Sequence, residues 1–195
     1  MDLSCVNGLY RYDAVIDGAR ASFKSGKPEI LLLNDFLAKD VYEKLRKDFS
    51  VAAGKEIYVP HECGFDELKL NKEVEEFFSS LHFRQFLTHL TGIKIKQVNL
   101  EARRFKHQSF TLMHDDANSK ERFVFFYVLT SKDWKSEWGG STIFRFGDAR
   151  LPAVFEPKGN SLAIMRVPKG MQDFVKYVNH FSGKNMFVKV SGTAL

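Results

Sequence analysis

The pattern of apolar and polar positions divides the chain into a helix-rich first part and a strand-rich second part. A short apolar run at residues 30–33 is typical of a buried strand. The segment after it carries an apolar stripe at intervals of four residues, formed by Val41, Leu45 and Phe49. This spacing predicts an amphipathic helix, and Asp40 with Glu43 resembles a capping box at its start.

A second helical region is predicted over residues 71–91. Its apolar stripes end at Gly92, a residue suited to the left-handed conformation that terminates many helices. Residues 50–70 contain glycine and proline breakers, so they are predicted as a loop with short extended pieces. Residues 1–29 show little periodicity and are predicted as an irregular N-terminal segment.

After Gly92 the chain changes to short runs rich in β-branched and aromatic residues, separated by glycine, proline and polar clusters. The predicted strands cover residues 93–105, 109–113, 123–129, 141–146, 161–167, 174–178 and 186–190. Many short strands at this spacing favour a sandwich or barrel over parallel βαβ units. The sequence therefore predicts one mainly β domain of the α+β class, residues 30–195, with supporting helices before the β core.

The composition narrows the class of protein. The 195 residues are 44% apolar and include 19 phenylalanines, which predicts an aromatic-rich core. No apolar run approaches the roughly 20 residues that cross a bilayer, and we expect a soluble cytoplasmic protein without a membrane partner. Cys5 and Cys63 are predicted to be unpaired thiols. The net charge of +5 is spread along the chain, so we expect no nucleic-acid partner.

The segment around residue 114 is the best candidate for chemistry. His114 and Asp116 are two residues apart at the end of a predicted strand, and alternate residues of a strand point to the same side. An imidazole and a carboxylate placed in this way can share a metal ion. With one more ligand they form the facial arrangement of non-haem iron(II).

The surroundings of His114 resemble the prolyl-hydroxylase-like branch of the 2-oxoglutarate- and iron(II)-dependent oxygenases. The similarity covers residues 30–192 in the right order. It is carried by Asn34–Leu37, Arg104-Phe105, Ser109, Leu112, His114, Asp116, Arg122–Leu129, Lys132–Trp134, Trp138–Phe144 and Pro157–Met165. The resemblance implies a double-stranded β-helix core, a jelly roll of the cupin-like type. It also implies iron(II) and 2-oxoglutarate as cofactors, and it suggests ascorbate as a further one.

The third metal ligand is where the chain departs from this family. A histidine is expected just before a Val-x-x-Val motif, but Asp173 occupies that position. An aspartate is a competent oxygen ligand, so a site with one histidine and two carboxylates is chemically reasonable. His180, seven residues further on, is the alternative if a loop bends back. A surface role for His180 is the simpler interpretation.

The cosubstrate pocket departs from the family as well. A basic side chain is expected to pair with the distal carboxylate of 2-oxoglutarate, but the aligned positions are Met186 and Phe187. Lys189, on the same strand face as Phe187, and Lys184 are the candidate replacements. Two further candidate cosubstrate contacts are Arg122 and Tyr127, and the place of the tyrosine falls on either Tyr127 or Val128.

These residues support a leading hypothesis and two rivals. The leading one is a 2-oxoglutarate- and iron(II)-dependent dioxygenase that uses O2 to hydroxylate a peptide, protein or small-molecule substrate, releasing succinate and CO2. By analogy, the resemblance favours a prolyl or peptidyl substrate. One rival is a catalytically degenerate member of the family that binds a peptide or protein. The other is a jelly-roll metal enzyme that does not use 2-oxoglutarate.

Overall fold

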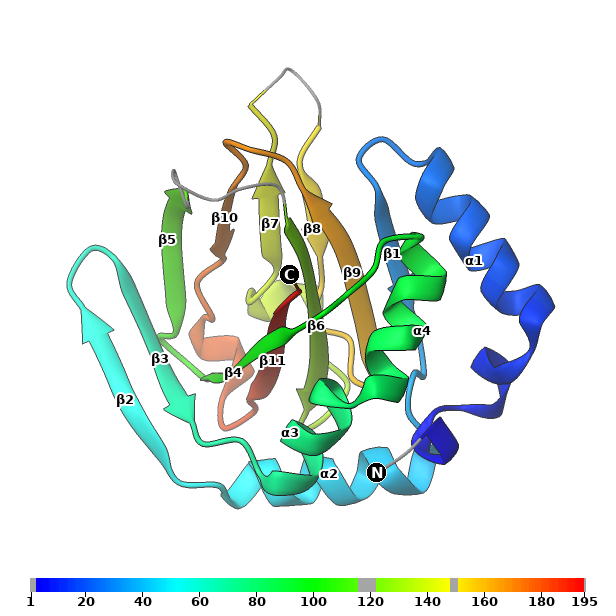
Figure 1. Ribbon diagram of the computed structural model, residues 1–195. Coiled ribbons are helices and arrows are strands. Elements are labelled where there is room, and N and C mark those ends of the chain that lie inside the picture. Colours follow the sequence, from blue (N-terminus) through cyan, green and yellow to red (C-terminus); the bar gives the residue numbers. More distant parts are fainter. Residues whose placement is uncertain (1–2, 116–121, 148–150, 195) are drawn as a thin grey trace.

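A computed structural model of the chain describes residues 3–115, 122–147 and 151–194 (Figure 1). Its α-helices all precede the main β core. They are α1 (Asp13–Ser25), α2 (Lys39–Val51), α3 (Lys72–Ser79) and α4 (Leu81–Thr91). Among the described residues, no helix is long and apolar enough to cross a lipid bilayer.

The strands form one continuous, curled antiparallel sheet. They are β1 (Ile30–Leu33), β2 (Gly54–Val59), β3 (Cys63–Leu68), β4 (Val98–Phe105), β5 (Phe110–Asp115), β6 (Arg122–Thr130), β7 (Thr142–Arg145), β8 (Ala153–Phe155), β9 (Ser161–Val167), β10 (Gln172–Val175) and β11 (Phe187–Ala194). The order is β1-β9-β6-β11-β4-β3-β5-β10-β7-β8, with β2 paired to the outer side of β3. The part β5-β10-β7-β8 curls over the longer part (Figure 1), and side chains from the two parts pack together in a barrel-like interior.

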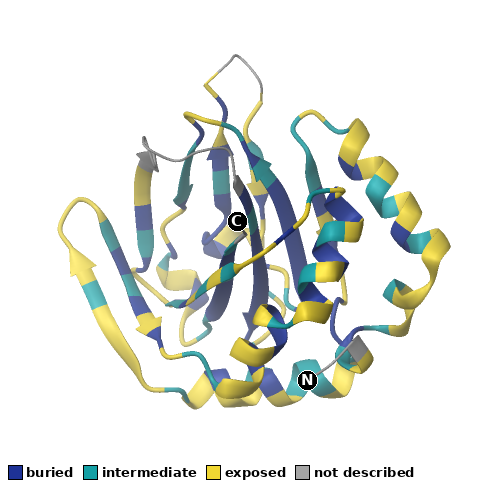
Figure 2. Cartoon of the chain, in the orientation of Figure 1, coloured by how far each residue is buried: buried dark blue, intermediate teal, exposed yellow. Residues whose placement is uncertain are grey.

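Two hydrophobic cores lie on opposite faces of the longer part of the sheet. The helix-side core packs the helices against it and includes Phe36, Phe77, Phe78, Phe83, Phe125 and Tyr127. The barrel core fills the interior and includes Phe105, Phe126, Phe144, Phe155, Val175 and Phe187. Because strand residues alternate between faces, β6 contributes Phe125 to one core and Phe126 to the other. This double use explains why β6 and β9 are buried along almost their whole length (Figure 2).

The fold confirms most of the elements predicted from the pattern. The predicted strands at residues 30–33 and 161–167 coincide with β1 and β9, and Gly92 ends α4 with φ of +76°. The predicted helix over 71–91 is broken at Ser80, whose side chain accepts a hydrogen bond from the Phe83 amide and so starts a new helix. The capping box was wrong, because Asp40 lies inside α2 and Ala38 is its N-cap.

Residues 50–70 form a β-hairpin rather than a loop. Strands β2 and β3 pair along their full length, from Gly54 opposite Leu68 to Val59 opposite Cys63. The hairpin was missed because β2 is exposed or half-buried throughout and so shows no alternation of apolar residues. β8, a strand of three residues, was missed as well.

The N-terminal segment is also more regular than predicted. Residues 13–25 form α1, which lies against α4 and β1 (Figure 1). Ile16 and Phe23, seven residues apart on this helix, are buried in the helix-side core, and the Phe23 ring lies 6.1 Å from that of Phe123. Residues 3–29 are therefore not an irregular extension, because they contribute side chains to the same core as the rest of the chain.

Candidate active site

The candidate metal position lies on the pairing between β5 and β10. His114 is the Cα partner of Asp173 in this antiparallel pair, so the two positions belong to one face of the sheet. On its other side, Asp173 is opposite Phe144 of β7, which is buried in the barrel core. The face shared by positions 114 and 173 is therefore the face toward the barrel interior. Asp116 lies outside the described residues, and its role as a ligand remains a prediction.

Lys189 is a buried cation on the opposite wall of the barrel. It is 8% exposed, and its Nζ lies 5.8 Å from the ring centroid of Phe105 and 5.7 Å from that of Phe126. Burial lowers the pKa of the Lys189 ammonium below its ordinary value, and Arg103 on the paired strand β4 adds to this. The negative charges of Asp173 and Glu101 act in the opposite direction. Lys189 therefore points inward and senses the charge at position 173.

The position expected for a basic cosubstrate anchor is filled by an aromatic ring. Phe187 is 2% exposed and stacks on Phe105, with the ring centroids 5.0 Å apart. Gly140, with φ of +80°, makes room for it, because a Cβ there would lie 2.7 Å from the Phe187 ring. Lys184, the other candidate cation, is exposed in the turn before β11. Of the two lysines, only Lys189 reaches the interior.

The structure places Tyr127 away from the predicted cosubstrate pocket. Its side chain belongs to the helix-side core, and its hydroxyl donates a hydrogen bond of 2.8 Å to Oδ1 of Asn160. Burial raises the pKa of Tyr127 well above its ordinary value, so the phenol stays a neutral donor. The neighbouring Val128 faces the barrel instead. The Tyr127 prediction is corrected, because strand parity turns it outward, while the side chain of Arg122, the first residue of β6, lies outside the described part.

His180 does not approach position 114. It is exposed in the short 3-10 helix His180–Ser182 and packs on Phe181, with ring centroids 4.1 Å apart. The chain between Asp173 and His180 runs antiparallel to β5, and the Val178 amide bonds to the carbonyl of Ser109 at the start of that strand. His180 therefore lies toward the other end of β5, and the alternative that it completes the metal site is corrected.

A surface pocket beside β5 was not recognised from the sequence. It has a volume of about 440 Å³ and is lined by His61, Glu62, Cys63, Phe65, Arg103, Thr111, Leu112 and Met113. Its cation, Arg103, lies over the Phe65 ring at 4.7 Å and pairs with Glu101 at 2.8 Å. The pocket is built by segments far apart in the sequence, so the residue pattern of a single segment does not predict it.

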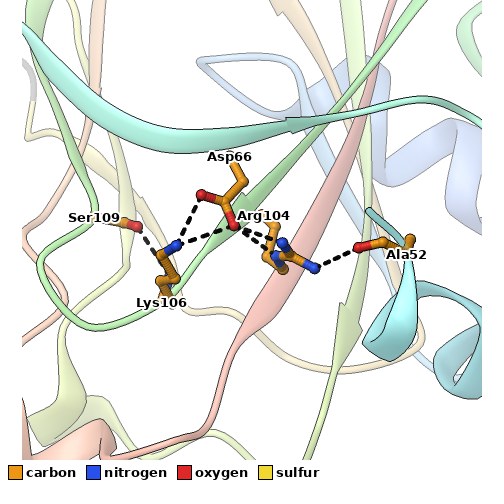
Figure 3. A network of polar contacts seen from close by, with 5 residues as sticks. All are labelled: Ala52, Asp66, Arg104, Lys106 and Ser109. Atoms are coloured by element: carbon orange, nitrogen blue, oxygen red, sulfur yellow. Dashed lines mark hydrogen bonds and ion pairs between the residues drawn. The ribbon is translucent and has the colours of Figure 1, made fainter. Parts of the chain in front are cut away.

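A second buried charge group lies on the helix side of the same sheet (Figure 3). Asp66 is 2% exposed and accepts hydrogen bonds from Arg104, at 2.9 and 2.6 Å, and from Lys106, at 3.0 Å. Arg104 also donates to the carbonyl of Ala52 at 2.9 Å. Burial alone would raise the pKa of the Asp66 carboxyl, but the hydrogen bonds from Lys106 and Arg104 outweigh it and lower that pKa. This network ties the β2–β3 hairpin to β4.

The residues available for iron(II) fit it in their chemistry. Positions 114 and 173 bring an imidazole-bearing and a carboxylate-bearing residue to one interior face, and nitrogen and oxygen donors suit this metal. Within the described side chains, no three His, Cys, Asp or Glu residues are grouped closely enough to hold a metal ion. The side chains of His114 and Asp116 lie outside this described part. Lys189 supplies the interior with a cation suited to a carboxylate.

Together, the barrel and its inward-facing positions define a double-stranded β-helix protein of the oxygenase type. Residues 65–193 match the family described as "Oxoglutarate and iron-dependent oxygenase degradation C-term", and the chain belongs to this family. The predicted family and fold class are thereby confirmed. The predicted enzyme class and cofactors agree with this description, which names oxoglutarate and iron.

Curated relatives match a shorter part of the chain. A protein of Xenopus laevis named prolyl 3-hydroxylase OGFOD1 is 32% identical over 93 residues, which are 46% of this chain and 18% of that protein. Its namesake from Mus musculus is 31% identical over 83 residues, 42% of this chain and 15% of that protein. The matched segment thus spans less than a fifth of these relatives.

Solved structures show the same fold at low sequence identity. A prolyl-4-hydroxylase from Pseudomonas putida has a TM-score of 0.68 at 12% identity and covers 92% of this chain and 97% of its own. A prolyl hydroxylase from Trichoplax adhaerens, solved with a peptide of hypoxia inducible factor, has a TM-score of 0.69 at 11% identity. The match covers 95% of this chain and 91% of that protein's chain. At these identities the likeness establishes the fold alone.

Proposed function

We propose that this chain is a 2-oxoglutarate- and iron(II)-dependent dioxygenase that hydroxylates a peptidyl substrate. The observation that supports this most directly is the register of His114 opposite Asp173 on the barrel's interior face. When bound, iron(II) would supply the oxygen activation that couples conversion of 2-oxoglutarate to succinate and CO2 with hydroxylation. His114, Asp116 and Asp173 would hold the metal through one imidazole and two carboxylates.

Lys189 would hold the distal carboxylate of 2-oxoglutarate inside the barrel. Its ammonium is buried between two aromatic rings, in surroundings of low dielectric where a carboxylate and an ammonium attract strongly. A bound carboxylate would also favour the charged form of Lys189, which burial disfavours. A lysine gives this contact charge without the two-point geometry of an arginine.

A peptide is the substrate class that the surroundings of β5 support best. The pocket of about 440 Å³ borders Leu112 and Met113, the two residues that precede His114. Both are exposed, at 49% and 41%, and offer apolar contact next to the guanidinium of Arg103. The names of the relatives, prolyl 3-hydroxylase and a prolyl hydroxylase with a bound peptide, support the same class. We further propose a cytoplasmic location, supported by the two free cysteines.

The decisive experiment measures metal binding and turnover separately. Anaerobic calorimetric titration with iron(II), with and without 2-oxoglutarate, should show binding of the metal and then of the cosubstrate. In the presence of O2 the loaded protein should form succinate, and His114→Ala should abolish it. The control is Lys176→Met, which changes an exposed lysine three residues beyond Asp173. Failure of the wild-type chain to form succinate with iron(II) and 2-oxoglutarate would contradict the proposal.

A second candidate is a peptide-binding domain without turnover. It is favoured by the stacked Phe105 and Phe187 rings, which occupy the position where a basic anchor is expected, and by the aspartate at position 173. This alternative predicts no heat of iron(II) binding in the same titration. It also predicts that substitution of Arg103, in the surface pocket, weakens peptide binding while substitution of Lys189 does not.

A further inference from the structure

Strand β5 contains a β-bulge immediately before the candidate metal position. His114 is opposite Asp173, but Thr111 is opposite Val175, so two residues of β5 face the single residue Phe174 of β10. These two bulge residues are Leu112 and Met113. Both are exposed, at 49% and 41%, so neither of these two consecutive side chains is packed into the barrel core. A regular strand would have turned one of them inward.

The bulge decides which residue of β5 reaches the interior face. Thr111 is 5% exposed and lies opposite Val175, a residue of the barrel core. With strict alternation, position 113 would share the face of Thr111 and position 114 would belong to the outside. The extra residue shifts the parity by one, so position 114 returns to the face of Thr111 and Asp173.

A side-chain hydrogen bond pins the bulge. The buried amide of Val175 donates to Oγ1 of Thr111 over 2.7 Å, so a hydroxyl rather than a carbonyl of β5 accepts at this point. The other edge of Thr111 is held by β3, where it pairs with Cys63. Loss of the hydroxyl would leave the Val175 amide without this acceptor, and the strand could recover a carbonyl partner only by changing its register.

We propose that Thr111 is a positioning residue for the metal site. Its hydroxyl selects the bulged register and thereby sets His114 opposite Asp173. The metal part of this inference rests on the proposed function, whereas the backbone part can be judged without a metal. Supporting groups of this kind typically change metal affinity by about 10–100-fold when they are removed.

The test uses three variants, two of which replace threonine with the nearly isosteric valine. Thr111→Val removes the hydroxyl, and Thr111→Ser keeps it as the rescue. Thr142→Val is the matched control, because Thr142 is also buried and lies beside Val175 from the other neighbouring strand, β7. Each variant is titrated with cobalt(II), a spectroscopic substitute for iron(II), and its metal-free crystal structure gives the register of β5 against β10.

We expect wild type, Thr111→Ser and Thr142→Val to bind cobalt(II) with similar affinity and the same absorption spectrum. Thr111→Val should bind at least about tenfold more weakly, and its crystal structure should show another residue opposite Asp173. An unchanged register in Thr111→Val would overturn the inference, and so would unchanged cobalt(II) affinity. If the wild type binds neither cobalt(II) nor iron(II), the proposed function and the metal part fall. The register then still decides the backbone part.

Discussion

Two buried charge groups lie on opposite faces of the same sheet, and they are built in opposite ways. On the helix side, Asp66 is surrounded by donors from Arg104 and Lys106 within 3.0 Å (Figure 3). In the barrel, Lys189 is flanked by two aromatic rings, and the negative charge of Asp173 favours its ammonium form. The first group is satisfied by hydrogen bonds within the chain. The second holds a charge in a hydrophobic interior, where a bound anionic ligand can provide the partner for it.

The difference separates a charge that supports the fold from one that supports binding. Burial of an ion costs several kcal/mol unless close partners offset it. Asp66 has such partners, so its removal should damage the fold. Lys189 faces ring surfaces, which offset only part of this cost. Its removal should leave the fold intact and abolish binding of an anion.

The largest expected effect is that of Asp66→Ala. The substitution leaves Arg104 without its carboxylate partner, so the free energy of unfolding should fall by about 3–5 kcal/mol, as when other buried ion pairs are broken. Urea unfolding measures it. As a control, Glu73→Ala breaks the exposed pair with Lys44 and should leave the unfolding midpoint near that of the wild type. An equal loss of unfolding free energy in Asp66→Ala and Glu73→Ala would show that the buried Asp66 network supports the fold no more than an exposed ion pair does.

Lys189→Met should give the opposite pattern. The flexible apolar side chain fills the space without a buried charge, so stability should stay constant or rise by about 1 kcal/mol. Affinity for 2-oxoglutarate in the presence of iron(II) should fall at least about tenfold, because the charge-assisted contact is lost. Calorimetry on Lys189→Met and on the exposed Lys176→Met tests this. A stable variant with unchanged cosubstrate affinity would remove Lys189 from the site.

Tyr127→Phe sharpens the comparison of the two faces. It removes the buried hydrogen bond to Asn160 and should cost about 1 kcal/mol of stability. Because Tyr127 belongs to the helix-side core, affinity for 2-oxoglutarate should not change. Thermal unfolding and the cosubstrate titration give the two readouts. Weaker cosubstrate binding with unchanged stability would restore the original prediction for Tyr127.

The smallest expected effects are changes in the stability of the fold at acid and at alkaline pH. The folded pKa of Asp66 lies below the ordinary 3.8, so its stabilisation is full above that value and is lost as the pH falls through the folded pKa. The folded pKa of Lys189 lies below 10.5, so stability should rise with pH between the folded value and 10.5. Melting temperatures measured across these pH ranges test both effects. In Asp66→Asn the fall of stability at acid pH should be smaller than in the wild type, and in Lys189→Met the rise of stability at alkaline pH should be absent.

Sequence patterns predicted the order of elements well where only one face is apolar. The helix over Val41 to Phe49 followed from its periodicity, and the strand before it followed from the apolar run at residues 30–33. The parity of Tyr127 could not be predicted in this way, because residues 123–129 of β6 are all apolar or aromatic and both faces of the strand are buried there. In the same way, the polar β2 carries no alternating pattern, so its hairpin becomes visible only through its pairing with β3.

The candidate site was predicted in part. The resemblance identified His114 and Asp173, which the fold brings opposite each other. The inward position of Lys189 was one of two alternatives until its neighbours were known. The bulge at Leu112 and Met113 has no glycine or proline to announce it, and it depends on a hydroxyl bond to a residue 64 positions away. Such a contact becomes visible only once the strands are paired.

Because β6 belongs to both cores, the helical layer and the barrel share a wall. Phe125 and Phe126 are adjacent in the chain yet pack against different neighbours, Phe83 on one side and Phe155 on the other. Neither half can melt while the other keeps its packing, since the shared strand would lose one face of its contacts. The chain should therefore unfold in a single cooperative transition, without a surviving subdomain.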